Sequence, residues 1–197
     1  MAKIFDDILL KGIRSGQVPA RSSSARQWFR DKAKSIGKVS DTKILKDDKE
    51  RLKSRTAIGS MYFFVYDAKH KKTLPYYDKF PLIFPVDRAP GGFYGLNFHY
   101  LPLPLRAELM DALYDVTNND RYNETTKLKL SYNILKNAEK FELFKPTFKR
   151  YLSSQVRSRF VKIEQSEWDI AIWLNSENFQ GASKTKVWSD SKKIIKG

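Results

Sequence analysis

Few side chains in this sequence could carry out catalysis. The two histidines are His70, in a lysine-rich stretch, and His99, which stands between Phe98 and Tyr100 in an expected strand. Neither is spaced from carboxylates as metal ligands are, so we expect His70 to be solvated and His99 to pack against its neighbours. Because the chain has no cysteine, thiolate nucleophiles, disulfides and most structural zinc sites are excluded.

Carboxylates, glycines and serines give no stronger sign of an active site. Asp67, Asp78 and Asp87 stand near expected strand ends and could be mistaken for a nuclease cluster, but aspartate at such places usually forms turns. The sequence GGFYG (91–95) lacks the helix and lysine that follow a phosphate-binding loop. No serine has an apparent histidine–aspartate partner set. We therefore predict a protein that is not an enzyme and has no catalytic residue, metal or cofactor.

Lysine and arginine alternate with aromatic residues in RQWFRDK (26–32), FKRYLSSQVRSRF (148–160) and KTKVWSDSKK (184–193). This pattern suits contacts with phosphates together with stacking on exposed bases. A solvated helix face backed by core rings explains the same residues equally well. The side chains predicted to bind nucleic acid or a partner protein are Arg21, Arg26, Trp28, Arg30, Lys32, Lys34, Lys69, Lys71, Lys72, Lys149, Arg150, Arg157, Arg159, Lys184, Lys186, Lys192 and Lys193.

The formal net charge is +15 on 197 residues, and it is unevenly distributed. Residues 1–58 contain fifteen Lys and Arg against seven Asp and Glu, a net charge of +8, so under a third of the chain carries just over half of the excess. Such an excess favours polyanions, namely nucleic acid or an anionic membrane surface. It also fits one face of an assembly with acidic partner proteins.

We predict that residues 1–58 form a basic arm, because they contain too few aromatic residues to build a core alone. The stretch 12–24 is rich in Gly and Ser and should be extended. Helices are expected in 22–36 and 41–54, each with a thin apolar stripe that requires a partner surface. That surface is either the rest of this protein, or a neighbouring subunit or nucleic acid, and the sequence leaves both open.

Rings, prolines and glycines are concentrated in residues 74–104, which hold eight aromatics, six prolines and three glycines. We interpret the rings as the core of a small sheet whose corners and edges the prolines define. Pro81 and Pro85 favour an edge or bulged strand, and Gly95 favours a bulge or a close approach. The strands expected in this segment are 80–87 and 89–101, and another strand, 59–68, is expected before it.

The remainder of the chain is predicted to be helical and then extended again. Apolar residues at helical spacing, with Pro104 or Pro146 suited to a first turn, predict the helices, and alternating residues in EWDIAIWL predict a strand. The helices expected are 103–116, 123–141 and 145–160, and the later strands are 159–164 and 167–174.

These elements predict an α+β domain. We expect a small curved antiparallel β-sheet or SH3-like barrel with an inserted helical block. The predicted parts are the basic N-terminal helical arm (1–58), the α+β body (59–183) and a basic C-terminal tail (184–197).

No membrane insertion or secretion signal is expected. The start, MAKIFDDILL, carries two aspartates where a signal peptide requires a basic beginning and an apolar run. No window approaches the roughly twenty apolar residues of a spanning helix.

Several long phrases resemble proteins of T4-like tailed bacteriophages (myoviruses). They are MYFFVYDAKHKKTLPYYDKFPLIFPV, GGFYGLNFHYLPLPLRAELMDALYD, EWDIAIWL and KVWSDS, and the resemblance covers residues 59–192. It implies a virion protein of the DNA end protector or head-completion type, or else a neck, tail or baseplate component. The resemblance implies no catalytic residue in this sequence.

We therefore expect a non-enzymatic virion-associated protein that binds DNA ends or packaged DNA at the head or neck. The resemblance leaves a structural component clamped to acidic neighbouring subunits as one alternative. An intracellular accessory protein of replication or recombination that binds nucleic acid is the other. The expected partners are DNA and other virion subunits in the oligomeric particle, after synthesis in the host cytoplasm.

Overall fold

Large side chains alternate across strand β2 (Met61–Phe63) and the residue after it. Met61 and Phe63 belong to one hydrophobic cluster, whereas Tyr62 and Phe64 belong to a second one. Successive side chains of a strand point to opposite faces of a sheet, so one sheet separates two cores. The computed structural model describes residues 3–19, 22–47, 49–117 and 142–197.

Six strands form this antiparallel sheet in the order β1–β7–β2–β4–β5–β6. The end strands β1 and β6 pair with β7 and β5 only, as far as the described residues show. The predicted α+β class is confirmed, but the sheet does not close into a barrel. A second small sheet pairs β3 with β8. The other strands are β1 (Leu52–Lys53), β3 (Tyr77–Asp78), β4 (Leu82–Ala89), β5 (Gly92–Asn97), β6 (Phe148–Leu152), β7 (Phe160–Ile163) and β8 (Phe179–Gln180).

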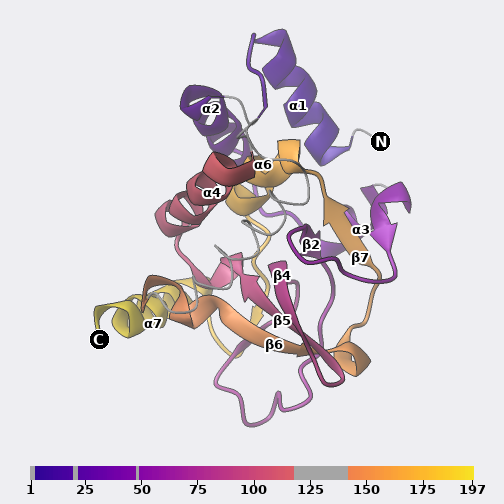
Figure 1. Cartoon of the computed structure of the whole chain (residues 1–197), viewed down its shortest axis with the longest axis vertical. Coiled ribbons are helices and arrows are strands. Elements are labelled where there is room, and N and C mark those ends of the chain that lie inside the picture. Colours follow the sequence, from indigo (N-terminus) through magenta and orange to yellow (C-terminus); the bar gives the residue numbers. More distant parts are fainter. Residues whose placement is uncertain (1–2, 20–21, 48, 118–141) are drawn as a thin grey trace.

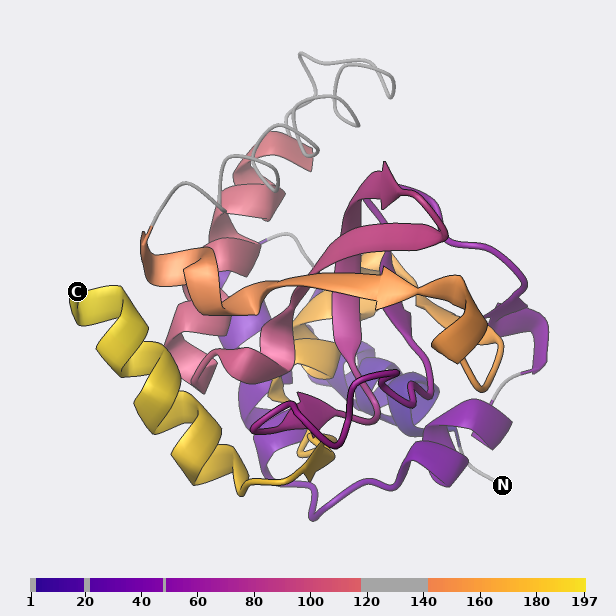
Figure 2. The same ribbon diagram turned by 90° about the horizontal axis from the view of Figure 1, so that it is seen from below.

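Helices cover the face of the sheet that carries Met61 and Phe63 (Figure 1). Apolar side chains of α1, α2, α3, α4 and α6 all join that cluster. Helix α7 lies apart from them and packs beside the segment that precedes β6 (Figure 2). The bounds are α1 (Ile4–Arg14), α2 (Ser23–Lys34), α3 (Asp41–Asp47), α4 (Leu103–Thr117), α6 (Trp168–Trp173) and α7 (Lys184–Lys196).

The aromatic segment forms the hairpin of β4 and β5. The register shifts between Pro85 and Asp87, so the predicted bulge lies next to Pro85, with Val86 as the extra residue. The alternative of an edge position is wrong for β4, which lies between β2 and β5. Pro85 stands beside this bulge, where the ladder is interrupted, and such a position is one at which a strand tolerates proline. Gly95 faces Pro85, and a Cβ on it would meet Ile83 and the Phe84 carbonyl at 3.2 Å.

The helix predicted for residues 145–160 is wrong. The chain there forms the turn η3 (Glu142–Thr147), strand β6, the turn η4 (Ser153–Gln155) and then enters β7. The apolar residues of this segment pack on both faces of the sheet: Phe148 packs on the helix-covered cluster and Tyr151 on the other cluster. Their three-residue spacing therefore resembles that of a helix. Pairing with β5 decides the outcome.

The strand predicted for residues 167–174 is also wrong, because Trp168–Trp173 forms helix α6. Glu164 and Glu167 form a capping box at the preceding turn η5 (Gln165–Glu167), which starts a helix. Residues 168–172 are all buried. A short helix enclosed on every side shows no single apolar face, so its sequence cannot be told from a strand by periodicity.

The helices of the first 58 residues pack on the rest of the protein, the first of the two alternatives left open. Phe5, Phe29 and Ile44 are each about 1% exposed and lie in the helix-covered cluster. Helix α1 runs to Arg14, so the expected extended stretch begins later. The helix expected over 41–54 ends at Asp47. The turn η1 (Lys49–Arg51) and strand β1 then follow.

The other predicted elements have different outcomes. The helix predicted for 103–116 is confirmed as α4, whereas the helix predicted for 123–141 lies outside the described residues. The division of the chain into arm, body and tail stays a prediction about how these parts behave. Within the part of the chain that the structure describes, no helix is both long and apolar enough to cross a membrane.

Candidate nucleic-acid interface

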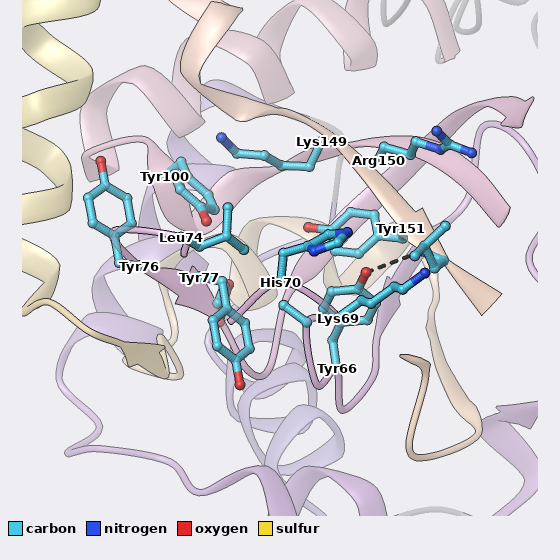
Figure 3. Close-up of a pocket in the computed structure, with 13 residues that line it drawn as sticks. Tyr66, Lys69, His70, Leu74, Tyr76, Tyr77, Tyr100, Lys149, Arg150 and Tyr151 are labelled. Atoms are coloured by element: carbon cyan, nitrogen blue, oxygen red, sulfur yellow. Dashed lines mark hydrogen bonds between the residues drawn. The ribbon is translucent and has the colours of Figure 1, made fainter. Parts of the chain in front are cut away.

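The loop between β2 and β3 forms one wall of a pocket (Figure 3). Backbone bonds from Lys71 N to Ala68 O (3.2 Å) and from Leu74 N to His70 O (3.0 Å) fold it into turns. Lys71 also pairs with Asp67 at 2.8 Å. These bonds leave Lys69 and His70 exposed at the rim of the pocket.

Strand β6 forms the facing wall. It is the last strand of the sheet and pairs with β5, so that Lys149 lies opposite Gly95 and Tyr151 opposite Phe93. Lys149, Arg150 and Tyr151 all line the pocket. An edge strand with basic side chains presents its charge to solvent and to a ligand rather than to another strand.

The inner end of the pocket is built by the turn η2 (Phe98–Tyr100), which follows β5. The Asn97 side chain caps this turn by accepting from His99 N at 2.9 Å. Tyr100, at the end of the turn, is buried and lies beneath Lys149, whose Nζ is 4.2 Å from the centre of its ring. This distance is within the range of a cation–π contact.

The buried Asp78 carboxylate links the end of β5 and the turn η2 to the chain beside β3. It accepts hydrogen bonds from Phe80 N (3.0 Å) and Asn97 Nδ2 (3.0 Å), and it lies 2.7 Å from His99 Nδ1. Asn97 also donates to the Tyr151 hydroxyl at 3.1 Å. A buried network whose members are satisfied rigidifies its surroundings, so the tyrosines around the pocket have defined positions.

Ser176, His99 and Asp78 together are the residue types of a hydrolase catalytic triad. Ser176 Oγ is 3.2 Å from His99 Nε2, and His99 Nδ1 is 2.7 Å from Asp78. This set is not visible in the sequence, because the three residues belong to separate elements. All three are buried, with exposures of 0–3%, and Ser176 therefore has no open face for a substrate. His99 is buried as predicted, although it lies in a turn and not in a strand.

A second buried group ties α4 to the end of the turn η2, to α6 and to the segment that follows α6. Arg106 is fully buried and donates to Leu101 O (2.7 Å), Ile172 O (2.9 Å) and Glu177 Oε1 (2.7 Å). Burial acts to raise the pKa of Glu177, but the charge of Arg106 and other cationic neighbours outweighs burial and lowers that pKa to about 2. This ion pair leaves Arg106 no free charge for a ligand.

The pocket has a volume of about 340 Å³. That is near the lower end of the roughly 300–1,000 Å³ of small-molecule sites. Figure 3 shows Tyr76 and Tyr100 on one side, Tyr66 and Tyr151 on the other, and Lys149 and Arg150 above them. The lining residues are Tyr66, Ala68, Lys69, His70, Leu74, Tyr76, Tyr77, Asp78, Tyr100, Lys149, Arg150, Tyr151 and Leu152.

Lys149 is the electrostatically unusual residue of the pocket. Burial lowers the pKa of its ammonium group to about 8. Among the described residues it has no carboxylate partner, although its side chain is only half-buried. It is still mostly protonated at pH 7, so a partly desolvated cation points into a tyrosine-lined space.

The tyrosines around it remain neutral. Burial raises the pKa of Tyr66, Tyr76, Tyr77, Tyr100 and Tyr151. Neutral phenols donate hydrogen bonds and offer aromatic faces without repelling an anion. The pocket can therefore bind a planar ring that carries negative charge.

The structure brings together three of the side chains predicted to bind nucleic acid. Lys69, Lys149 and Arg150 line the pocket, and Lys72 is exposed on the same loop. Arg150 donates to Pro90 O at 2.8 Å. Lys69 and Lys72 have no carboxylate partner in the described parts of the chain, whereas Lys71 pairs with Asp67.

The predicted residues of α2 lie elsewhere, at the top of Figure 1, while β6 crosses the lower half. Arg30 is buried, and its guanidinium bonds Asp169 and Asp111 at 2.7 Å. Its charge is therefore used within the protein and is not available to a ligand. Arg26 pairs with Asp111, Lys32 lies over the Trp28 ring, and Lys34 lies over the Trp173 ring.

The remaining predicted residues lie on α7 and near β7. Lys184 bonds Asn175 and Lys186 pairs with Asp190, while Lys192 and Lys193 are exposed. Arg157 and Arg159 are exposed and bond backbone oxygens of Ser154 and Leu52. Arg21 lies outside the described residues.

The sequence did not identify the tyrosines as part of a site. It placed the rings of residues 74–104 in the core, and Tyr100 is indeed buried. The available signal was the density of tyrosine beside the lysine-rich loop. The approach of Lys149 to Tyr100 joins two distant parts of the chain and is visible only in the fold. Asp67, Asp78 and Asp87 form no metal cluster, and none exists among the residues described.

The comparisons with known proteins give one match. The sequence matches the family described as Phage T4 terminal DNA protecting protein over residues 3–196. No curated protein and no solved structure matches it. Because the match covers nearly the whole chain, including its first 58 residues, the protein belongs to the family of the phage T4 terminal DNA protecting protein.

Proposed function

We propose that this protein binds the ends of linear double-stranded DNA, without chemical reaction, and shields them from exonucleases. The family match over residues 3–196 carries this proposal. The net charge of +15 supports it, since an excess of this size favours a polyanion. The pocket supports it further, because unpaired cations and aromatic rings are the means by which proteins hold DNA phosphates and exposed bases.

The proposed interface centres on the pocket rim and extends over nearby exposed cations. Lys69, Lys72, Lys149 and Arg150 make the central contacts. Each neutralises phosphate charge without first breaking an internal ion pair, because none of the four has a carboxylate partner in the described structure. The outer contacts are made by Arg157, Arg159, Lys186, Lys192 and Lys193, which are exposed.

Protection of ends is tested by exonuclease digestion. A blunt linear duplex is incubated with increasing protein and then with an exonuclease that requires a double-stranded end. We expect digestion to stop at saturating protein, and linear competitor DNA to relieve protection far better than a closed circle of the same sequence. Equal competition by the circle, or full digestion at saturation, would reject end protection.

The central contacts are tested by charge reversal. Lys69→Glu should weaken end binding and protection, because the side chain is exposed at the pocket rim. Lys43→Glu on α3 is the matched control, since Lys43 is also exposed and the change of net charge is identical. If both variants lose the same affinity, only the total charge matters and the interface lies elsewhere.

We also propose that the protein acts within the phage particle, together with other virion subunits. The family's phage origin supports this location. Mass spectrometry of purified particles should detect it at a fixed low copy number. Detection in the infected-cell lysate alone would favour an intracellular nucleic-acid-binding role.

A further inference from the structure

We propose that the pocket between the β2–β3 loop and strand β6 holds the terminal nucleotide of a DNA duplex, unpaired from its partner base. The base lies against the tyrosine rings and the phosphate lies at Lys149. This inference rests on the DNA-end binding proposed above and names the group that is recognised there.

The size of the pocket selects a single nucleotide. Its volume of about 340 Å³ is suited to one ligand of small-molecule size, and a duplex cannot enter it. Only a nucleotide that leaves the stack can do so. The recognised group is therefore a base with its sugar and phosphate, and the duplex itself remains outside against the exposed lysines.

The tyrosines provide the surface for the base. Tyr76 is the least buried tyrosine of the lining, and its ring is tilted by 36° from that of Tyr100, with 6.1 Å between the two centres. Leu74 is 43% exposed at the same mouth. Base–aromatic stacking tolerates any sequence because every base has a π face, which suits a protein that must accept DNA ends of any sequence.

Lys149 provides the contact with the phosphate. Its ammonium group is partly desolvated, and no carboxylate among the described residues compensates its charge. An anion that enters the pocket therefore gains more from Lys149 than from a fully hydrated surface lysine. Arg150 and Lys69 at the rim add positive charge on the path of the neighbouring phosphates.

The same pocket explains a preference for ends. Extruding an internal nucleotide costs a few kcal/mol of unpairing and unstacking, and the cost is lowest where the base is already poorly held. A terminal base pair stacks on one side only. The end nucleotide consequently enters the pocket at a lower cost than any internal one, so a single-nucleotide site discriminates ends from continuous duplex.

The pocket is built in advance of binding. The bonds of Asp78 to Asn97 and His99, and of Asn97 to Tyr151, fix the strand and turn that carry the tyrosines. A preorganised site does not pay for ordering its side chains when the ligand arrives.

Photo-crosslinking tests where the terminal nucleotide lies. Short duplexes carry 5-iododeoxyuridine either at the terminal position or at an internal one, and crosslinked peptides of the full-length protein are mapped by mass spectrometry. We expect the terminal label to react with Tyr76 or Tyr100 and the internal label to react weakly with either. Equal labelling from both positions, or terminal crosslinks confined to α2 or α7, would overturn the proposal.

Two variants measure the contributions of the pocket. Tyr76→Ala should weaken binding to open-ended duplex by about 5- to 150-fold, the range for loss of one stacked base, whereas Tyr76→Phe should bind as the parent does. Affinity for a dumbbell duplex with closed ends should stay unchanged in both. If Tyr76→Ala folds poorly, Leu74→Glu gives the same test, because Leu74 is exposed and a carboxylate at the mouth repels the phosphate.

These outcomes separate the pocket from the function. If the parent protein protects ends but the pocket variants do so equally well, end binding stands and the nucleotide pocket is rejected. If the parent protein itself does not distinguish open from closed ends, the proposed function fails. Loss of dumbbell affinity in Tyr76→Ala would show a general effect on the interface and would also reject the pocket.

Discussion

At the scale of single residues, Arg106 and Lys149 are both removed from water, but they differ in whether a carboxylate balances their charge. Arg106 is fully buried and has a carboxylate and several carbonyl oxygens as partners. Lys149 is half-buried and has only the ring of Tyr100 beneath it, as far as the described residues show. A desolvated cation without a counter-ion is unfavourable unless a ligand supplies one. Arg106 therefore maintains the fold, whereas Lys149 is available for an anion.

The lowered pKa of Lys149 predicts a pH dependence of DNA binding. With a pKa of about 8, Lys149 loses its charge between pH 7 and pH 9, so affinity for DNA ends should fall over this range. In the absence of DNA, the unfolded chain holds this proton more tightly than the folded one, so this residue's contribution to stability rises as the pH increases above about 8. The titratable and charged groups around Lys149 in the pocket are Tyr66, Lys69, His70, Tyr76, Tyr77, Asp78, Tyr100, Arg150 and Tyr151.

The measurement is a binding titration at fixed ionic strength across this pH range. Lys149→Arg is the control, because a guanidinium stays charged throughout, and it should remove most of the loss. A parent protein whose affinity is constant between pH 7 and pH 9 would show that Lys149 carries no phosphate. Uptake of a proton on DNA binding near pH 8 would be independent support, since a bound phosphate raises the pKa of Lys149.

At the scale of elements, the helices of the first 58 residues are part of the core. Phe29 is about 1% exposed, stacks edge-on against Trp28 and belongs to the cluster under the sheet. Arg30 on the same helix joins α2 to α4 and α6 through Asp111 and Asp169. A positively charged segment is thus held by carboxylates of the body despite the body's net positive charge.

This packing predicts the effect of Phe29→Ala. Truncating a buried phenylalanine costs about 3–5 kcal/mol, so the free energy of unfolding of the whole protein should fall by that amount in urea titrations. Leu10→Ala on α1 is the control, because Leu10 is 51% exposed and its removal should change stability little. An unchanged unfolding midpoint in Phe29→Ala would mean that the first 58 residues behave as an independent arm.

At the scale of the whole molecule, the excess charge does not lie on one face. Predicted cations of α2 are far from β6 in Figure 1, and several are already paired within the protein, including Arg26, Arg30 and Lys186. The formal charge of +15 therefore overstates the number of phosphates that can be contacted at once. Lys69, Lys149 and Arg150 line one pocket, Lys72 lies on the same loop as Lys69, and none of the four has a carboxylate partner among the described residues.

The salt dependence of DNA binding measures this number. If Lys69, Lys72, Lys149 and Arg150 each neutralise one phosphate, these four should contribute about −3.6 to the slope of log K against log salt concentration, from about −0.9 per phosphate on duplex DNA, and any outer contact adds to it. Lys72→Gln should reduce its magnitude by about 0.9, and Lys43→Gln should leave it unchanged. A slope near zero would indicate that the charge meets acidic proteins and not DNA.

The sequence by itself determined the α+β class, the hairpin strands, helix α4 and the bulge at Pro85. These features depend on local causes: alternation of side chains, helical spacing and the missing N–H of proline. It also identified Lys149 and Arg150 as candidates for binding, because their charge stands beside aromatic residues, and Lys69, which lies in a basic loop.

Only the tertiary structure decided which of these candidates remain free. Arg30 and Lys149 are both basic residues beside rings in the sequence, yet two carboxylates from distant elements take the charge of Arg30 and none among the described residues reaches Lys149. In the same way, pairing with β5 turned residues 148–152 from an expected helix into a strand. Burial of residues 168–172 on every side leaves helix α6 without a single apolar face. In each case the deciding contact is made by residues far away in the chain, and such contacts leave no pattern in the local sequence.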